Sequence, residues 1–110
     1  MFKEIKQISV SDLKLWRDES KDFLLIDVRN PDEYKYANLK GELIPMQDIP
    51  ENISKIPKDR PVVFHCHHGS RSKKVISWLQ EQADDFDKLY NLEGGIHAWS
   101  EEIDTNAPMY

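Results

Sequence analysis

The segment Phe23–Val28 reads FLLIDV, and this nearly unbroken apolar run limits the possible folds more than any other feature of the chain. Such a run is typical of a strand that is buried on both faces of a parallel sheet. A second strand is predicted at Val62–His65, directly after Pro61. The other strands are expected to be short, and the sequence places them at residues 4–8, 42–45 and 88–92.

Helical patterns separate these strands. Ser9, followed three residues later by Asp12, predicts the N-cap of the first helix. Asn30-Pro31 predicts the start of the second, which is expected to extend through Tyr36. Further helices are expected at residues 51–56, from Ser72 onward and at 96–103. The alternation predicts an α/β fold with a mostly parallel five-stranded sheet that helices flank on both faces. Residues 1–110 are expected to form one domain, because this length supports a single core.

The composition excludes several classes of function. A net charge of −5 argues against nucleic acid as a main partner, because no basic excess is present to neutralise phosphates. No apolar run approaches the length of about 20 residues that spans a bilayer, and the first ten residues lack the apolar core of a signal peptide. A lone cysteine cannot form an internal disulfide, so the chain does not require an oxidising compartment. We expect a soluble, cytoplasmic protein with no membrane partner.

The candidate functional element is the turn Cys66-His-His-Gly-Ser-Arg71, which joins the Val62–His65 strand to the next helix. Gly69 takes a positive φ at little steric cost, so the backbone can curl back on itself. A loop of this kind points several backbone N–H groups at one position above the cysteine sulfur, beside the positive end of the helix dipole. This arrangement binds anions and lowers the pKa of the Cys66 thiol. The sequence therefore predicts a reactive cysteine at the carboxyl end of a strand, where sites form in such sheets.

Two other interpretations of this turn compete with a reactive thiol. A lone cysteine after a β-branched run is often an inert buried residue, although the turn and the helix that follow argue against this here. A zinc site is the second interpretation, because three histidines lie close to Cys66 in the sequence, namely His65, His67 and His68. Ligands this close in sequence cannot all reach one tetrahedral ion, and His97 joins them only if the fold happens to bring it near. We therefore expect no metal and no cofactor.

Four segments resemble, in the same order, the signature motifs of the rhodanese family. They are LLIDVRNPDEY at Leu24–Tyr34, NLKGELIPM at Asn38–Met46, CHHGSRS at Cys66–Ser72 and YNLEGGIHAW at Tyr90–Trp99. In the second segment Asn38 stands where the family usually has histidine, and Glu42 stands where it usually has alanine. Both departures lie outside the cysteine loop, so they concern local packing rather than chemistry.

The resemblance implies a rhodanese-like three-layer domain with sulfurtransferase activity. Cys66 would be the catalytic nucleophile and would carry a sulfane sulfur as a persulfide. The donor would be a small anion such as thiosulfate, and the acceptor would be cyanide, a thiol or a protein group. The rest of the loop would bind substrate, and its residues are His67, His68, Gly69, Ser70, Arg71 and Ser72. Asp27 and Arg29, at the end of their strand, are expected to hold the loop in place.

The roles of three loop side chains stay open. Arg71 either binds the anionic donor through its guanidinium group or braces the loop by pairing with an acidic residue. His67 and His68 either extend the positive field and touch substrate or are solvated, since imidazole is near neutral at pH 7. Glu33, in the first segment, is interpreted as part of the scaffold.

Other activities on the same fold fit the sequence less well. Phosphatases of the cell-division-cycle type, and the arsenate reductases related to them, resemble rhodaneses but have five residues between cysteine and arginine. Only four residues separate Cys66 from Arg71, so a tetrahedral phosphoryl group would be cramped above the sulfur. Non-catalytic interaction modules of this fold commonly have a degraded loop, whereas this loop is complete. A persulfide carrier with protein partners needs the same loop and is an alternative to the enzyme.

Overall fold

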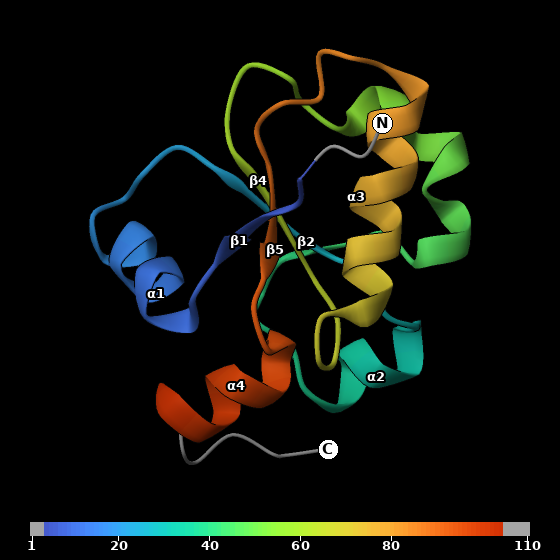
Figure 1. Cartoon of the computed structure of the whole chain (residues 1–110). Coiled ribbons are helices and arrows are strands. Elements are labelled where there is room, and N and C mark those ends of the chain that lie inside the picture. Colours follow the sequence, from blue (N-terminus) through green and yellow to red (C-terminus); the bar gives the residue numbers. More distant parts are fainter. Residues whose placement is uncertain (1–3, 105–110) are drawn as a thin grey trace.

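The computed structural model describes residues 4–104, which form a central sheet with helices on both faces (Figure 1). The strands are β1 (Lys6–Ile8), β2 (Leu24–Asp27), β3 (Glu42–Leu43), β4 (Val62–His65) and β5 (Leu89–Leu92). They lie in the order β1-β5-β4-β2-β3, and every neighbouring pair is parallel. The prediction of an α/β fold on a parallel five-stranded sheet is confirmed.

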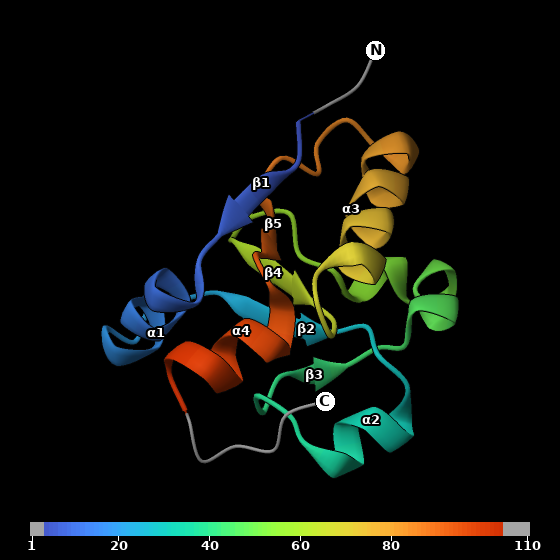
Figure 2. The same ribbon diagram turned by 60° about the horizontal axis from the view of Figure 1, so that its bottom comes forward.

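Helical segments follow each strand of the described chain. They are α1 (Val10–Asp18), α2 (Pro31–Tyr36), α3 (Ser70–Gln82) and α4 (Gly95–Glu102), with the 3-10 helices η1 (Met46–Asp48) and η2 (Pro50–Lys55) between β3 and β4. Figure 2 shows α1 and α4 together on one face of the sheet and α3 on the other face. The loop from β4 to α3 therefore lies where both helical layers meet the carboxyl ends of the strands.

Short-range signals account for most boundaries. The Ser9 hydroxyl accepts a hydrogen bond from the Asp12 N–H at 3.1 Å and caps α1 as predicted. Pro31 occupies the first position of α2, which has the predicted bounds. The segment predicted as a helix at 51–56 is the 3-10 helix η2, and the strand predicted at 42–45 ends at Leu43.

The helix after the cysteine turn begins at Ser70, two residues before the predicted start at Ser72. Gly69, at a φ of 110°, is its N-cap, and the Gly69 carbonyl accepts the Lys73 N–H at 3.2 Å to close the first turn. A Cβ atom at position 69 would lie only 3.2 Å from Nδ2, the side-chain amide nitrogen of Asn91. Both the left-handed conformation and the limited space favour glycine at this position.

The strand β4 is fully buried and separates two apolar clusters of the core. Phe64 belongs to the cluster on the α3 face, together with Ile76. Val63, which points to the opposite face, belongs to the cluster that includes Leu13 of α1 and Ile96 of α4. This packing on both sides fixes the end of β4, from which the cysteine loop begins.

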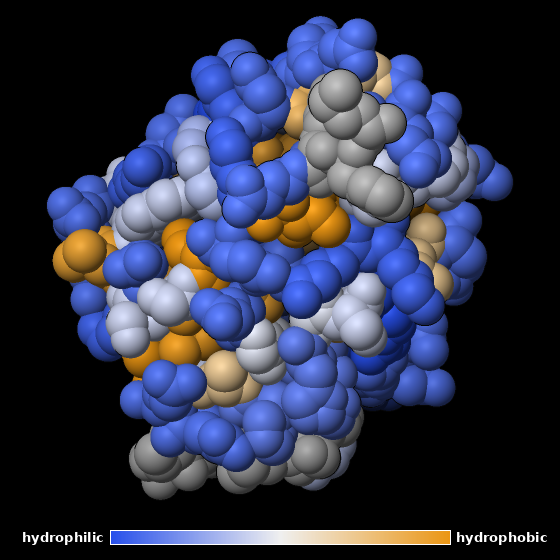
Figure 3. Space-filling model, in the orientation of Figure 1, coloured by the Kyte–Doolittle hydropathy of each residue, from blue (hydrophilic) through white to orange (hydrophobic). Residues whose placement is uncertain are grey.

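The face seen in Figure 3 is largely hydrophilic, with small hydrophobic areas between the polar side chains. Charged residues make up 32% of the chain, and acidic residues outnumber basic ones by 20 to 15. Among residues 4–104, no helix combines the length and the apolar character needed to cross a membrane.

Candidate active site

The cysteine loop follows β4, and Cys66 lies at its base with only 1% of its surface exposed. The backbone N–H of Gly69 donates to the Cys66 sulfur over a distance of 3.1 Å. The loop therefore curls around the sulfur, as predicted from the position of Gly69 in the turn. The sulfur lies next to the N-terminus of α3, where free N–H groups and the helix dipole favour a negative charge.

Opposing effects set the pKa of the Cys66 thiol. Burial is the largest effect and raises the pKa, because it disfavours the charged thiolate. Hydrogen bonds from the Ser72 hydroxyl and from the backbone N–H groups of Ser72, Gly69 and Arg71 lower it. These hydrogen bonds together outweigh burial, so the pKa lies below the usual value, in the predicted direction. A lower pKa raises the fraction of thiolate, which is the nucleophilic form.

Ser72 and Asn91 form a polar contact beside the sulfur that the sequence did not predict. Ser72 Oγ lies 3.5 Å from Cys66 Sγ and 3.1 Å from the Gly69 carbonyl oxygen, and it contacts Asn91 Oδ1. The Asn91 amide donates to Gln7 Oε1 at 2.9 Å, which fixes its orientation. A hydroxyl has a single hydrogen, so the three acceptors compete for the Ser72 donor. The available signal was a polar Asn91 within the mostly apolar strand β5.

Arg71 forms an ion pair with Glu33 across the loop and α2. Two guanidinium nitrogens of Arg71 lie 2.7 and 2.9 Å from the two carboxylate oxygens of Glu33. This hydrogen-bonded pair lowers the pKa of Glu33 to about 2. Glu33 also accepts the Asn30 N–H at 3.2 Å, which ties it to the start of α2. Of the two roles left open for Arg71, the structure shows the bracing contact, and Glu33 is its acidic partner.

A buried ion pair lies at the end of β2. Arg29 Nη2 is 2.8 Å from Asp27 Oδ2, and neither side chain is exposed. Arg29 also donates to the Ala37 carbonyl at 2.7 Å, so the pair connects the chain on both sides of α2, which carries Glu33. His65 lies 3.7 Å from Asp27, and its burial lowers the imidazole pKa to about 4. His65 is therefore a neutral core residue near pH 7.

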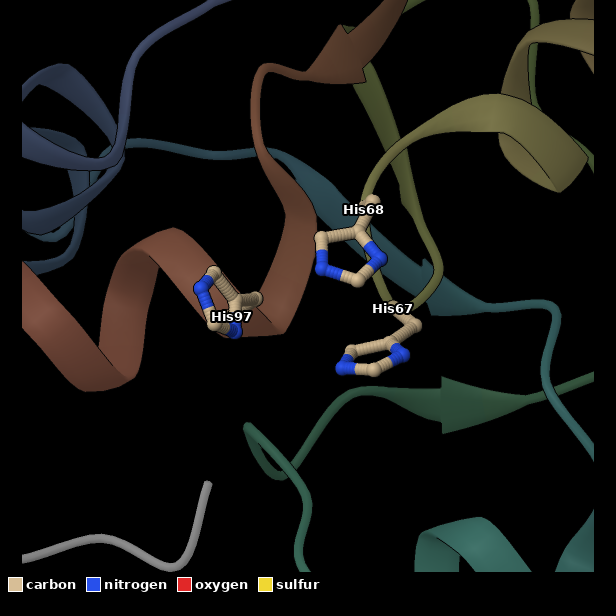
Figure 4. Close-up of side chains that lie close together, drawn as sticks. All are labelled: His67, His68 and His97. Carbon is tan, nitrogen blue, oxygen red and sulfur yellow. The ribbon is translucent and has the colours of Figure 1, made fainter. Parts of the chain in front are cut away.

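The other three histidines gather beside the loop, as Figure 4 shows. His67 and His68 come from the loop itself, and His97 faces them from α4. Their potential ligand nitrogens all lie within 4.8 Å of one another. His97 was expected to join the loop histidines only if the fold brought it near, and the fold does so, because α4 packs directly against the loop. Ser70, the remaining loop residue, is exposed on the first turn of α3.

The chain matches the model of the rhodanese-like domain family over residues 9–102. This range includes the cysteine loop, the buried ion pair and the helix that carries His97. The chain belongs to the rhodanese family. The resemblance inferred from its four motifs is thereby confirmed.

Rhodanese relatives of similar length align over most of the chain. YtwF, a putative sulfurtransferase of Bacillus subtilis, is 39% identical over 100 residues, which are 90% of this chain and 94% of the relative. The thiosulfate sulfurtransferase GlpE of Coxiella burnetii is 31% identical over 100 residues, which are 90% of this chain and 88% of the relative. The crystal structure of a rhodanese-like domain protein from Staphylococcus aureus matches with a TM-score of 0.79 at 32% identity. The match covers 96% of this chain and 99% of the Staphylococcus aureus chain.

In this rhodanese domain, replacing Ser72 with alanine is expected to move the midpoint of the pH dependence of Cys66 alkylation by iodoacetamide upward by about one pH unit. The thiolate loses a hydrogen bond worth about 1.5 kcal/mol, and about 1.4 kcal/mol corresponds to one pH unit. Ser77→Ala is the matched control, because Ser77 is an exposed residue of the same helix. An unchanged midpoint in the Ser72→Ala variant would mean that the backbone N–H groups alone activate the thiol.

Proposed function

We propose that this domain transfers a sulfane sulfur from a small anionic donor such as thiosulfate to a thiophilic acceptor, through a persulfide on Cys66. The observation that carries the proposal is the Gly69 N–H, which lies 3.1 Å from the Cys66 sulfur at the N-terminus of α3. A hydrogen-bond donor is thus present where the sulfur becomes negatively charged. Membership of the rhodanese family and the sulfurtransferase names of the two relatives support sulfur transfer in general.

In the first half-reaction, the Cys66 thiolate attacks the outer sulfur of thiosulfate. A new S–S bond forms on Cys66, the bond between the two sulfur atoms of thiosulfate breaks, and sulfite leaves with the electron pair. The negative charge moves to the terminal sulfur of the persulfide. Backbone N–H groups of the loop and the Ser72 hydroxyl stabilise this charge.

In the second half-reaction, the acceptor attacks the terminal sulfur and the Cys66 thiolate leaves. The lowered pKa of Cys66 favours this step, because a more acidic thiol is a better leaving group. A second cysteine is not needed, since the acceptor itself resolves the persulfide. The Arg71–Glu33 pair keeps the loop closed around the sulfur in both half-reactions.

Two other candidate functions would rely on the same loop. Phosphate ester hydrolysis needs room for a tetrahedral group, but four residues separate Cys66 from Arg71 and the Gly69 N–H already contacts the sulfur. A persulfide carrier between proteins would use the same thiol chemistry as the enzyme. The net charge of −5 would suit a basic protein partner of such a carrier.

The test is the intact mass of the protein after incubation with thiosulfate. The wild-type chain is expected to gain about 32 Da, the mass of one sulfur atom, and to lose this gain on addition of cyanide. Initial rates are measured over a range of donor concentrations at several fixed acceptor concentrations, and their double-reciprocal plots should be the parallel lines of ping-pong kinetics. The absence of a mass gain, or a gain that persists in Cys66→Ser, would contradict the proposed function.

A further inference from the structure

The three histidines beside the loop lie close enough together to be candidate ligands of one metal ion. The ring centroids of His67 and His68 lie 3.9 Å apart, and that of His97 lies 5.9 and 4.8 Å from them, respectively. The ligand nitrogens of all three lie within 4.8 Å of one another. In Figure 4 the three rings face a common space between the loop and α4.

Main-chain hydrogen bonds hold the two halves of this cluster together. The N–H of Ile96 donates to the Cys66 carbonyl at 3.0 Å, and the N–H of His97 donates to the His67 carbonyl at 3.1 Å. A Cβ atom at Gly95 would lie 2.4 Å from the His67 carbonyl oxygen and 2.5 Å from that of Cys66, so only glycine allows this approach. The cluster therefore rests on backbone that is fixed from both sides.

Glu101 contacts the ring of His97. Nε2 of His97 lies 2.7 Å from a carboxylate oxygen of Glu101, one turn further along α4. Nδ1 of His97, on the other side of the ring, is buried and has no hydrogen-bond partner among residues 4–104. Metal-bound histidines commonly donate their second nitrogen to a carboxylate, which fixes the tautomer and makes the ligand nitrogen more basic.

We propose that His67, His68 and His97 bind one divalent transition-metal ion, with zinc as the reference ion, beside the active-site loop. Imidazole nitrogens suit zinc, copper and nickel. Three nitrogens bound to a tetrahedral zinc at about 2.0–2.1 Å lie about 3.4 Å apart, so nitrogens that are now up to 4.8 Å apart need to approach one another by at most about 1.4 Å. The exposed ring of His68 can make most of this movement. A fourth coordination position remains for water or another ligand.

This metal site does not depend on sulfur transfer. Its ligands are imidazoles, whereas the sulfur chemistry uses the Cys66 thiol, which is itself a potential metal ligand. The binding experiment therefore uses the full chain without an affinity tag and with Cys66→Ser, so that a thiolate cannot contribute. The failure of the proposed function would leave the expected binding unchanged.

The test is titration with zinc chloride by calorimetry, together with the visible absorption of the cobalt complex. The Cys66→Ser chain is expected to bind one equivalent of zinc, and added zinc should raise its melting temperature. In the Cys66→Ser chain, a second substitution, His97→Ala, should lower the zinc affinity at least about a hundredfold. The substitution Glu101→Gln in the same chain should lower it about 10- to 100-fold. Glu102→Gln is the matched control, since Glu102 is exposed on a different face of α4, and it should leave the affinity unchanged.

Two results would overturn the metal site. One is the absence of zinc binding to the Cys66→Ser chain at about millimolar zinc, far above the dissociation constant that three imidazoles give. The other is an unchanged affinity in the His97→Ala variant. If that variant does not fold, His68→Gln replaces it, because the His68 side chain is exposed. Unchanged affinity in a folded His68→Gln variant would equally contradict the site.

Discussion

Replacing Arg29 with methionine is expected to lower the free energy of unfolding by about 3–5 kcal/mol. The substitution leaves the Asp27 carboxylate in a fully buried position without the guanidinium that lies 2.8 Å away. It also removes the donor to the Ala37 carbonyl, which is 2.7 Å from Arg29. Unmade hydrogen bonds in the core cost the full desolvation of the groups that are left behind. Urea unfolding at pH 7, followed by circular dichroism, measures the change.

Two variants serve as controls for this stability effect. Lys14→Met removes a cation from an exposed pair in α1, in which Lys14 and Asp18 are 51% and 59% exposed, and it should cost no more than about 1 kcal/mol. Asp27→Leu combined with Arg29→Met removes both buried charges and should recover part of the loss. If the double variant loses as much free energy of unfolding as its two single variants lose together, the ion pair is not the reason for the loss.

The buried pair also links stability to the site. Arg29 joins the end of β2 to the chain after α2, and α2 positions Glu33, which in turn pairs with Arg71 of the loop. A folded Arg29 variant is therefore expected to hold the loop less firmly. The prediction from sequence that Asp27 and Arg29 support the loop thus has a physical route through α2.

Local signals were sufficient for elements whose ends are marked by neighbouring residues. Pro31 after Asn30 marks the start of α2, and the apolar run after Pro61 marks β4, so both were predicted with their observed bounds. The start of α3 was predicted two residues late. Its N-cap is Gly69 in a left-handed conformation, whereas an N-cap is usually signalled by serine, threonine, aspartate or asparagine.

Contacts between distant segments were not predictable in the same way. Glu33 lies 38 residues from Arg71, and Asn91 lies 19 residues from Ser72, yet both pairs touch at the cysteine loop. These contacts depend on the order of the strands and on which helix ends converge at the carboxyl edge of the sheet. His97 reaches the loop for the same reason. The cysteine loop was predictable because its chemistry is contained in consecutive residues.

Inserting one glycine between Gly69 and Ser70 is expected to lower thiosulfate turnover at least about a hundredfold and to raise the affinity for arsenate. The Gly69 N–H and the Ser72 hydroxyl now lie 3.1 and 3.5 Å from the Cys66 sulfur. An added residue moves the start of α3 away from the sulfur, and a misplacement of about 1 Å can cost about 10²-fold in rate. The wider loop also has five residues between cysteine and arginine, which is the phosphatase spacing and leaves room for a tetrahedral oxyanion.

The two effects of the insertion are measured as kcat/KM for thiosulfate and as the inhibition constant of arsenate. A glycine inserted between Asp84 and Asp85, in the exposed turn after α3, is the matched control and should change neither value. If sulfur transfer survives the loop insertion, loop size does not set specificity, and the geometric case against phosphatase chemistry fails. If turnover falls without a gain in arsenate affinity, the insertion disorders the N–H groups instead of widening the loop. Sulfur transfer then depends on the position of these donors, while the spacing between Cys66 and Arg71 does not select the substrate.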